Sequence, residues 1–142
     1  MGVFDENLLN ICFKVLKEKG LKSFAVIRAA DGMDEISPEV PTKALIQRDG
    51  QFSELMISPS AFGFEFFSKN AIAINGPKRG LEVFREVISG KSSYYRDTTV
   101  MNAAFCLWIA GRADDFLAAR EIVEKALDSG KVEAKVNEIF GK

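Results

Sequence analysis

Three carboxylates stand within five residues of the chain, at Asp31, Asp34 and Glu35. They follow an apolar run at residues 24–27, which is typical of a strand buried on both faces. In open α/β sheets, ligands bind outside the carboxyl ends of the strands, where this loop would lie. Mg²⁺ suits such a loop, because it keeps several waters and binds through one or two carboxylates plus substrate phosphates. A solvated acidic turn would explain the same residues equally well.

The absence of histidine limits what other chemistry the chain can perform. None occurs among the 142 residues, which excludes Ser-His-Asp and Cys-His nucleophiles and metal sites with imidazole ligands. The two cysteines, Cys12 and Cys106, are far apart, form no C-x-x-C motif and lie in apolar, helix-like runs. We predict buried, unreactive thiols in a reducing cytoplasm, and we assign no catalytic residue within the chain.

Charge and hydropathy argue against nucleic acid and membrane as partners. The 19 basic and 20 acidic residues give a net charge of −1, so no overall field attracts either partner. No apolar run approaches the ~20 residues that cross a bilayer. Phe62, Phe64, Phe66 and Phe67 form an aromatic cluster, but no cationic groove accompanies it, so packing is a better interpretation than base stacking.

The periodicity predicts a partial α/β unit, with a short sheet and a β-hairpin flanked by helices. Asp49-Gly50 marks the hairpin, and Asp5, Asp97 and Asp114 are candidate N-caps. A helix followed by a buried strand is half of a βαβ unit, which favours a parallel sheet. Because so little sheet is available for several helices, the chain resembles a piece of a larger α/β domain with an open sheet edge. We expect a strand at residues 23–28, a hairpin at 43–57, and helices at 5–19, 77–89, 97–110, 114–129 and, in a short last one, 132–140.

The segment Asp31-Gly32-Met33-Asp34-Glu35-Ile36-Ser37, followed by Pro41-Thr42, is similar to the Asp-Gly-x-Asp-Glu-Ile-Ser…Pro-Thr segment of the anthranilate phosphoribosyltransferases. The similarity keeps one collinear order over nearly the whole chain, which makes it far stronger than any single motif. It continues at Gly2-Val3-Phe4 and at residues 58–63, 85–90, 95–97, 102–104 and 127–131.

This resemblance implies a function and a site. The family transfers the phosphoribosyl group of phosphoribosyl pyrophosphate to the amino group of anthranilate in tryptophan biosynthesis, with Mg²⁺. Its Asp-Glu pair binds magnesium, which carries over to Asp34 and Glu35, whereas Asp31 is a less direct candidate behind them. The substrate-binding residues of this chain are unknown, since the family's Gly-Thr-Gly-Gly-Asp, Asn-x-Ser-Thr and Lys-His-Gly-Asn segments do not occur in it.

We therefore expect residues 1–142 to correspond to the C-terminal portion of the family's α/β domain, without its N-terminal helical domain. By itself such a chain should be inactive, and its partner would be the missing N-terminal half or a second copy. One departure is Arg28-Ala29, where the family often has His-Gly. Two alternatives stay open: a stand-alone, non-catalytic interaction domain, and a fragment of a related nucleoside phosphorylase or transferase paralogue.

Overall fold

A computed structural model describes residues 1–141 as five α-helices, two 3₁₀-helices and three strands. No helix over these residues is long and apolar enough to cross a membrane. In chain order, the elements are α1 (Glu6–Glu18), β1 (Phe24–Ala29), β2 (Thr42–Arg48), β3 (Gln51–Ile57), η1 (Pro59–Phe62), η2 (Lys69–Ile72), α2 (Gly76–Ile88), α3 (Tyr94–Ile109), α4 (Phe116–Asp128) and α5 (Lys131–Phe140).

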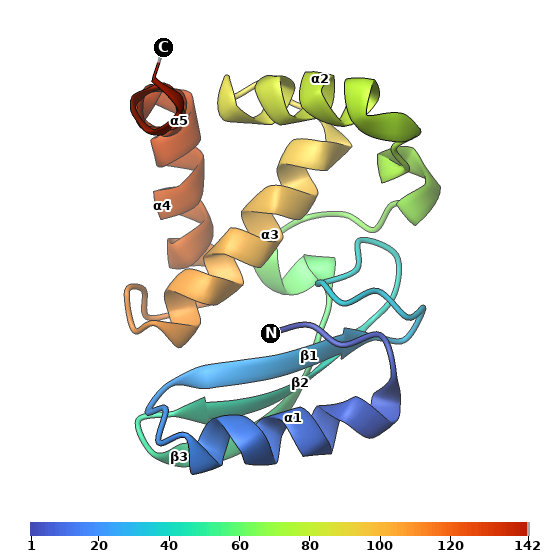
Figure 1. The fold of residues 1–142 in the computed structure, drawn as a ribbon, viewed down its shortest axis with the longest axis vertical. Helices are drawn as coiled ribbons and strands as arrows, with labels where there is room; N and C mark the ends of the chain where they lie inside the picture. The colour runs from blue at the N-terminus through green and yellow to red at the C-terminus, as the bar shows by residue number, and fades with distance from the viewer. Residues whose placement is uncertain (142) are drawn as a thin grey trace.

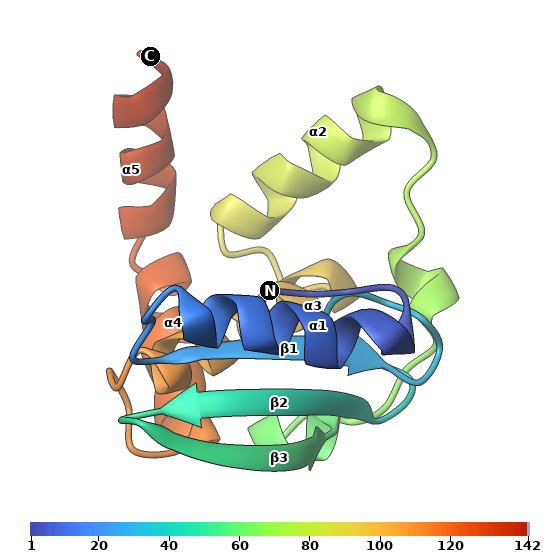
Figure 2. The same ribbon diagram turned by 60° about the horizontal axis from the view of Figure 1, so that its bottom comes forward.

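The sheet lies between two layers of helices, with α1 on one face and α3 and α4 on the other (Figures 1 and 2). Alternate residues of β1 supply both cores, which confirms a strand buried on both faces. Phe24 and Val26 pack in the cluster that includes Leu9 of α1. Ala25 and Ile27 pack in the cluster that includes residues of α3, α4 and η1. Helices α2 and α5 lie at the end of the molecule away from the sheet (Figure 1).

The three strands are antiparallel, in the order β1-β2-β3, which corrects the expectation of a parallel sheet. The connection from β1 to β2 contains no helix, and parallel neighbours need a long crossover, usually a helical one. Parallel pairing occurs where the N-terminal residues run beside β1, with Gly2 opposite Ile27. Met1 N–H donates to Ala25 O at 3.0 Å, and Ile27 N–H donates to Met1 O at 2.9 Å. Residues 1–3, α1 and β1 therefore form a βαβ unit with a very short first strand.

The hairpin between β2 and β3 forms where the sequence predicts it. Arg48 pairs with Gln51, leaving Asp49 and Gly50 as a two-residue turn with φ of 51° and 80°. Positive φ at both central positions matches a type I′ turn, whose twist suits the strands it joins. The Asp-Gly step and the strand pattern therefore predict this unit from local sequence alone.

Two of the three predicted helix caps differ by a few residues. Asp5 caps α1, accepting a hydrogen bond from Asn7 N–H at 2.9 Å as expected. Asp97 lies instead inside the first turn of α3, which Ser93 caps through Arg96 N–H. Asp115, rather than the preceding aspartate, caps α4. Ser and Asp are both good N-caps, so local sequence leaves such choices to tertiary packing.

The prediction of buried thiols is wrong for Cys106. This residue is exposed on α3 next to the buried Phe105, whereas Cys12 is half-buried against the α1 core. In the aromatic cluster, Phe62 is fully buried and stacks on Phe116 with ring centroids 4.7 Å apart. Phe66 is exposed, so the cluster only partly enters the core.

Candidate metal-binding loop

Asp34 and Glu35 lie on the loop of residues 30–41 that joins β1 to β2, and both are exposed. Other side chains make the hydrogen bonds and ion pairs of this loop, among them Asp31 and Ser37. Within residues 1–141, the carboxylates of Asp34 and Glu35 take part in no such contact. Both are therefore available to a ligand from outside the loop.

Asp31 is committed to the structure of the loop itself. Its Oδ1 accepts a hydrogen bond from Met33 N–H at 3.2 Å, and its Oδ2 accepts from Ser37 Oγ at 3.1 Å. Lys69 Nζ lies 3.3 Å from the same Oδ2. Burial acts to raise the pKa of Asp31, but the hydrogen bonds from Met33, Ser37 and Lys69 together outweigh it, and the pKa is lowered. Asp31 thus remains charged and turned toward Lys69.

The backbone around Asp34 and Glu35 lies against Gly2 on one side and is hydrogen-bonded to Asn102 on the other. A Cβ placed on Gly2 would lie 1.5 Å from Asp34 O, so only glycine fits the N-terminal strand against this carbonyl. On the other side, Asn102 Oδ1 accepts a hydrogen bond from Ile36 N–H at 2.9 Å. In the sequence, Gly2 and Asn102 stand out only as part of the segments that resemble the family. Local patterns do not reveal that they contact the loop, because these contacts join residues far apart in the chain.

Ser37 and Thr42 close the end of the loop nearest β2. Ser37 N–H donates to Thr42 Oγ1 at 3.0 Å, and Ser37 Oγ accepts from Glu39 N–H and Val40 N–H. Ser37 and Thr42 are fully buried, and their polar groups are satisfied inside the loop. Contacts within the loop therefore add to those with Asn102 and Lys69, and the two exposed carboxylates take part in none of them.

Two carboxylates alone make an incomplete metal site. Across residues 1–141, no group of three or more His, Cys, Asp or Glu side chains comes close enough to hold a metal ion. The donors available, two carboxylate groups, fit a hard cation such as Mg²⁺ when waters and phosphate oxygens complete its octahedron. A Mg²⁺ ion bound by these two residues would therefore need further oxygen ligands, such as waters or phosphate oxygens.

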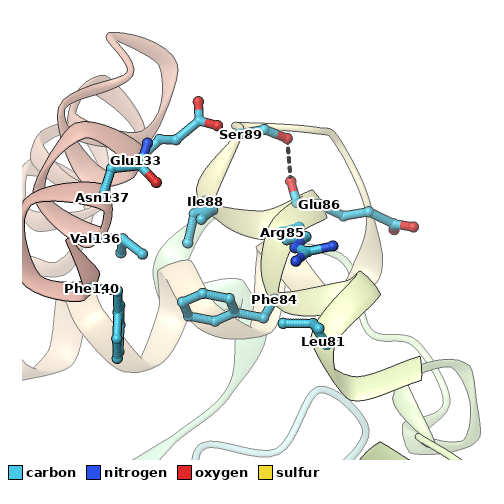
Figure 3. Close-up of a pocket in the computed structure, with 10 residues that line it drawn as sticks. All are labelled: Leu81, Phe84, Arg85, Glu86, Ile88, Ser89, Glu133, Val136, Asn137 and Phe140. Atoms are coloured by element: carbon cyan, nitrogen blue, oxygen red, sulfur yellow. Dashed lines mark hydrogen bonds between the residues drawn. The ribbon is translucent and has the colours of Figure 1, made fainter. Parts of the chain in front are cut away.

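Two largely apolar cavities lie beside α2. Glu35 contributes to the lining of one, about 520 Å³ in volume, with Val83 of α2 and Thr98 of α3. The other, of about 620 Å³, lies between α2 and α5, where Phe84 and Phe140 face each other (Figure 3). Neither places a second carboxylate beside Glu35, so neither extends the metal site.

Arg28, which stands where the resemblance leads one to expect histidine, has a structural contact. Its Nε donates to Phe4 O at 3.0 Å and ties the N-terminal segment to β1. Ala29 is fully buried at the end of that strand. These two residues therefore stabilise the entrance to the acidic loop without reaching Asp34 or Glu35.

Residues 1–133 match the family described as "Glycosyl transferase family, a/b domain". Since the match covers nearly the whole chain, the protein belongs to this family.

Curated relatives of the chain include two anthranilate phosphoribosyltransferases. The chain is 34% identical over 139 residues to an anthranilate phosphoribosyltransferase from Legionella pneumophila (strain Paris), and 31% identical over 140 residues to one from Methanobrevibacter smithii. These alignments cover 98% and 99% of this chain but 40% and 42% of the relatives. The chain therefore spans about two-fifths of the length of the curated relatives it matches.

Solved structures of the same enzyme share the fold. The anthranilate phosphoribosyltransferase from Saccharomyces cerevisiae in complex with PRPP and Mg superposes with a TM-score of 0.85 at 22% identity. The enzyme from Thermus thermophilus superposes with a TM-score of 0.82 at 18% identity. Both comparisons cover 94% of this chain and 39% of the solved one, and at these identities they establish the fold alone.

Proposed function

We propose that this chain supplies the magnesium-binding carboxylates of an anthranilate phosphoribosyltransferase. In this proposal, Asp34 and Glu35 hold Mg²⁺ against the pyrophosphate of phosphoribosyl pyrophosphate while the phosphoribosyl group passes to the amino group of anthranilate. The observation that carries it is the pair of exposed carboxylates, free of internal partners, on a loop whose backbone packs against Gly2 and is hydrogen-bonded to Asn102. The curated relatives bear the name of this enzyme, and one solved relative holds PRPP and Mg.

The chemistry of the transfer explains the need for the carboxylates. The bond between the ribose carbon and pyrophosphate breaks as the amine nitrogen bonds to that carbon, so negative charge develops on the leaving oxygen. Magnesium, when bound, neutralises this charge. Asp34 and Glu35 fix where the positive charge lies, and Asp31 does not compete for it because Lys69 and Ser37 engage its carboxylate. The amine needs positioning more than a strong base, which agrees with a chain that has no histidine.

We also propose that the chain corresponds to the C-terminal portion of the enzyme and is inactive without the rest. It spans about two-fifths of its relatives, and positioning two substrates contributes roughly 7–11 kcal/mol to such reactions. The N-terminal portion would then be its partner, joining the sheet beyond residues 1–3, which already pair with the free edge of β1. A cytoplasmic location agrees with two free cysteines.

Complementation tests this proposal. The purified chain is mixed with the N-terminal portion of a relative, or joined to it covalently, and the loss of anthranilate fluorescence is followed with phosphoribosyl pyrophosphate and Mg²⁺. We expect no turnover by the chain alone, turnover by the joined protein, and a weakened magnesium dependence when Asp34→Asn and Glu35→Gln are introduced. Asp114→Asn, which neutralises an exposed acid in the loop before α4, serves as the control. Turnover by the chain alone, or an unchanged magnesium dependence in the two variants, would refute the proposal.

A further inference from the structure

Asn102 projects from α3 to the acidic loop and makes one hydrogen bond at each end of its amide. Its Oδ1 accepts from Ile36 N–H at 2.9 Å, and its Nδ2 donates to Thr98 O, one turn earlier in α3, at 3.0 Å. The second hydrogen bond fixes which amide atom faces the loop, because the nitrogen already has an acceptor on its own helix. Asn102 Oδ1 therefore faces the loop as a hydrogen-bond acceptor.

The donor to Asn102 is the residue that directly follows the carboxylate pair. Ile36 is fully buried in the core cluster shared by the sheet, α3 and α4, so its backbone has little freedom. On the other side of the pair, Gly2 lies against Asp34 O so closely that no side chain fits. The backbone from Asp34 to Ile36 is thus packed against Gly2 at one end and hydrogen-bonded to Asn102 at the other, while the two carboxylates stay free.

We propose that Asn102 is a positioning residue for the metal pair, acting through the backbone of Ile36 rather than by contact with the metal. The proposal rests on the function proposed above. Ligand groups bind a metal best when their supporting contacts hold them in place before it arrives. Other side chains of the loop and of β2 bind the neighbouring backbone: Asp31 accepts from Met33 N–H, and Thr42 accepts from Ser37 N–H. Within residues 1–141, Asn102 is the side chain that hydrogen-bonds to the backbone of residues 34–36 themselves.

A paramagnetic titration tests the role in the 142-residue chain. Mn²⁺ is added to the ¹⁵N-labelled protein with inorganic pyrophosphate, and the broadening of amide signals at residues 34–36 gives the affinity. We expect Asn102→Ala to weaken this affinity by about fivefold, because the hydrogen bond that positions the backbone before the metal binds is lost. Asn102→Asp keeps an acceptor for Ile36 N–H but loses the donor to Thr98 O, so it should restore the affinity in part.

Matched variants separate positioning from added charge and from general destabilisation. Thr99→Asp, combined with Asn102→Ala, adds a carboxylate to the same helix without replacing the lost acceptor, so it should not restore binding. Exchange of the Ile36 amide without metal should be faster in Asn102→Ala and slow again in Asn102→Asp. If Asn102→Ala does not fold, Asn102→Ser gives a second truncation.

The outcomes distinguish this inference from the proposed function. If the double variant Asp34→Asn/Glu35→Gln binds Mn²⁺ and pyrophosphate like the wild type, the metal assignment fails and the positioning role fails with it. If that variant loses binding while Asn102→Ala retains it, the positioning role alone is wrong. Recovery with Thr99→Asp, or none with Asn102→Asp, also overturns the role of Asn102.

Discussion

Replacing Gly2 by alanine should destabilise the protein by forcing the N-terminal strand away from the acidic loop. The added Cβ would lie 1.5 Å from Asp34 O and 2.9 Å from its Cα. An ordinary contact begins at 3.4 Å. One of the two backbones must therefore move by about 2 Å, which no side-chain rotation can supply.

The magnitude follows from what such a movement breaks. The N-terminal segment is held by hydrogen bonds from Met1 N–H to Ala25 O, from Ile27 N–H to Met1 O, and from Val3 N–H to Ile27 O. At about 1 kcal/mol each, their loss gives a destabilisation of about 3 kcal/mol. Yielding by the loop instead would cost about 1–3 kcal/mol as overpacking. Either route predicts a clear loss of unfolding free energy.

Urea denaturation followed by the fluorescence of Trp108, the one tryptophan of the chain, measures this loss. Hydrogen exchange of the Ile27 amide, which donates to Met1 O, reports whether the strand has detached. Gly80→Ala, inside α2, is the matched control. A Cβ on Gly80 would lie 3.8 Å from Ile74 Cγ2, which is an ordinary contact. That change should stabilise the protein by about 0.5–1 kcal/mol, because alanine favours helix interiors.

The reasoning is refuted if Gly2→Ala changes the unfolding free energy by less than about 0.5 kcal/mol, the range of neutral surface substitutions. Unchanged protection of the Ile27 amide, together with a loss of stability, would show that the loop moves rather than the N-terminal strand. A similar loss in Gly80→Ala would point to a general intolerance of alanine rather than to the contact with Asp34.

Three further predictions concern other parts of the molecule. The folded-state pKa of Asp31 is lowered, so its contribution to stability is present above the unfolded pKa near 3.8 and is lost as the pH falls through the folded pKa. The wild type should therefore be more stable than Asp31→Asn by about 1 kcal/mol at neutral pH. In urea titrations, this difference should shrink below about pH 4. Gly50→Ala should cost about 1–2 kcal/mol in a thermal melt, because φ is 80° at this turn position. Cys106 should react quickly with a thiol reagent in the folded protein and Cys12 slowly, as counted by absorbance, and equal rates would contradict their different exposure.

Local signals predict much of this fold. Three features can be predicted from residues close together in sequence: the burial of β1 on both faces, the Asp49-Gly50 turn and the Asp5 cap. The start of α3 does not follow from local sequence. Both Ser93 and Asp97 can cap a helix, and stacking of Tyr94 on Phe67, with centroids 4.5 Å apart, lies beyond any local window.

The candidate site also has features that local sequence predicts and features that depend on distant contacts. The cluster of Asp31, Asp34 and Glu35 is visible in the sequence, but the different state of Asp31 depends on Lys69, 38 residues away. The role of Asn102 depends on a contact across 66 residues. The exposure of Cys106 likewise depends on which face of α3 the sheet covers. Residue types therefore suggest the chemistry, whereas tertiary contacts determine which carboxylates are free to perform it.

The separation of 66 residues between Ile36 and Asn102 also has a consequence for the order of folding. Closing a chain segment costs entropy that rises by about 0.6 kcal/mol for each doubling of its length. The contact between α3 and the loop therefore costs about 3 kcal/mol more to close than the two-residue turn between β2 and β3. We expect the hairpin to gain amide protection early in refolding and Ile36 to gain it late, so that the backbone carrying the carboxylate pair is fixed only after α3 has docked on the sheet.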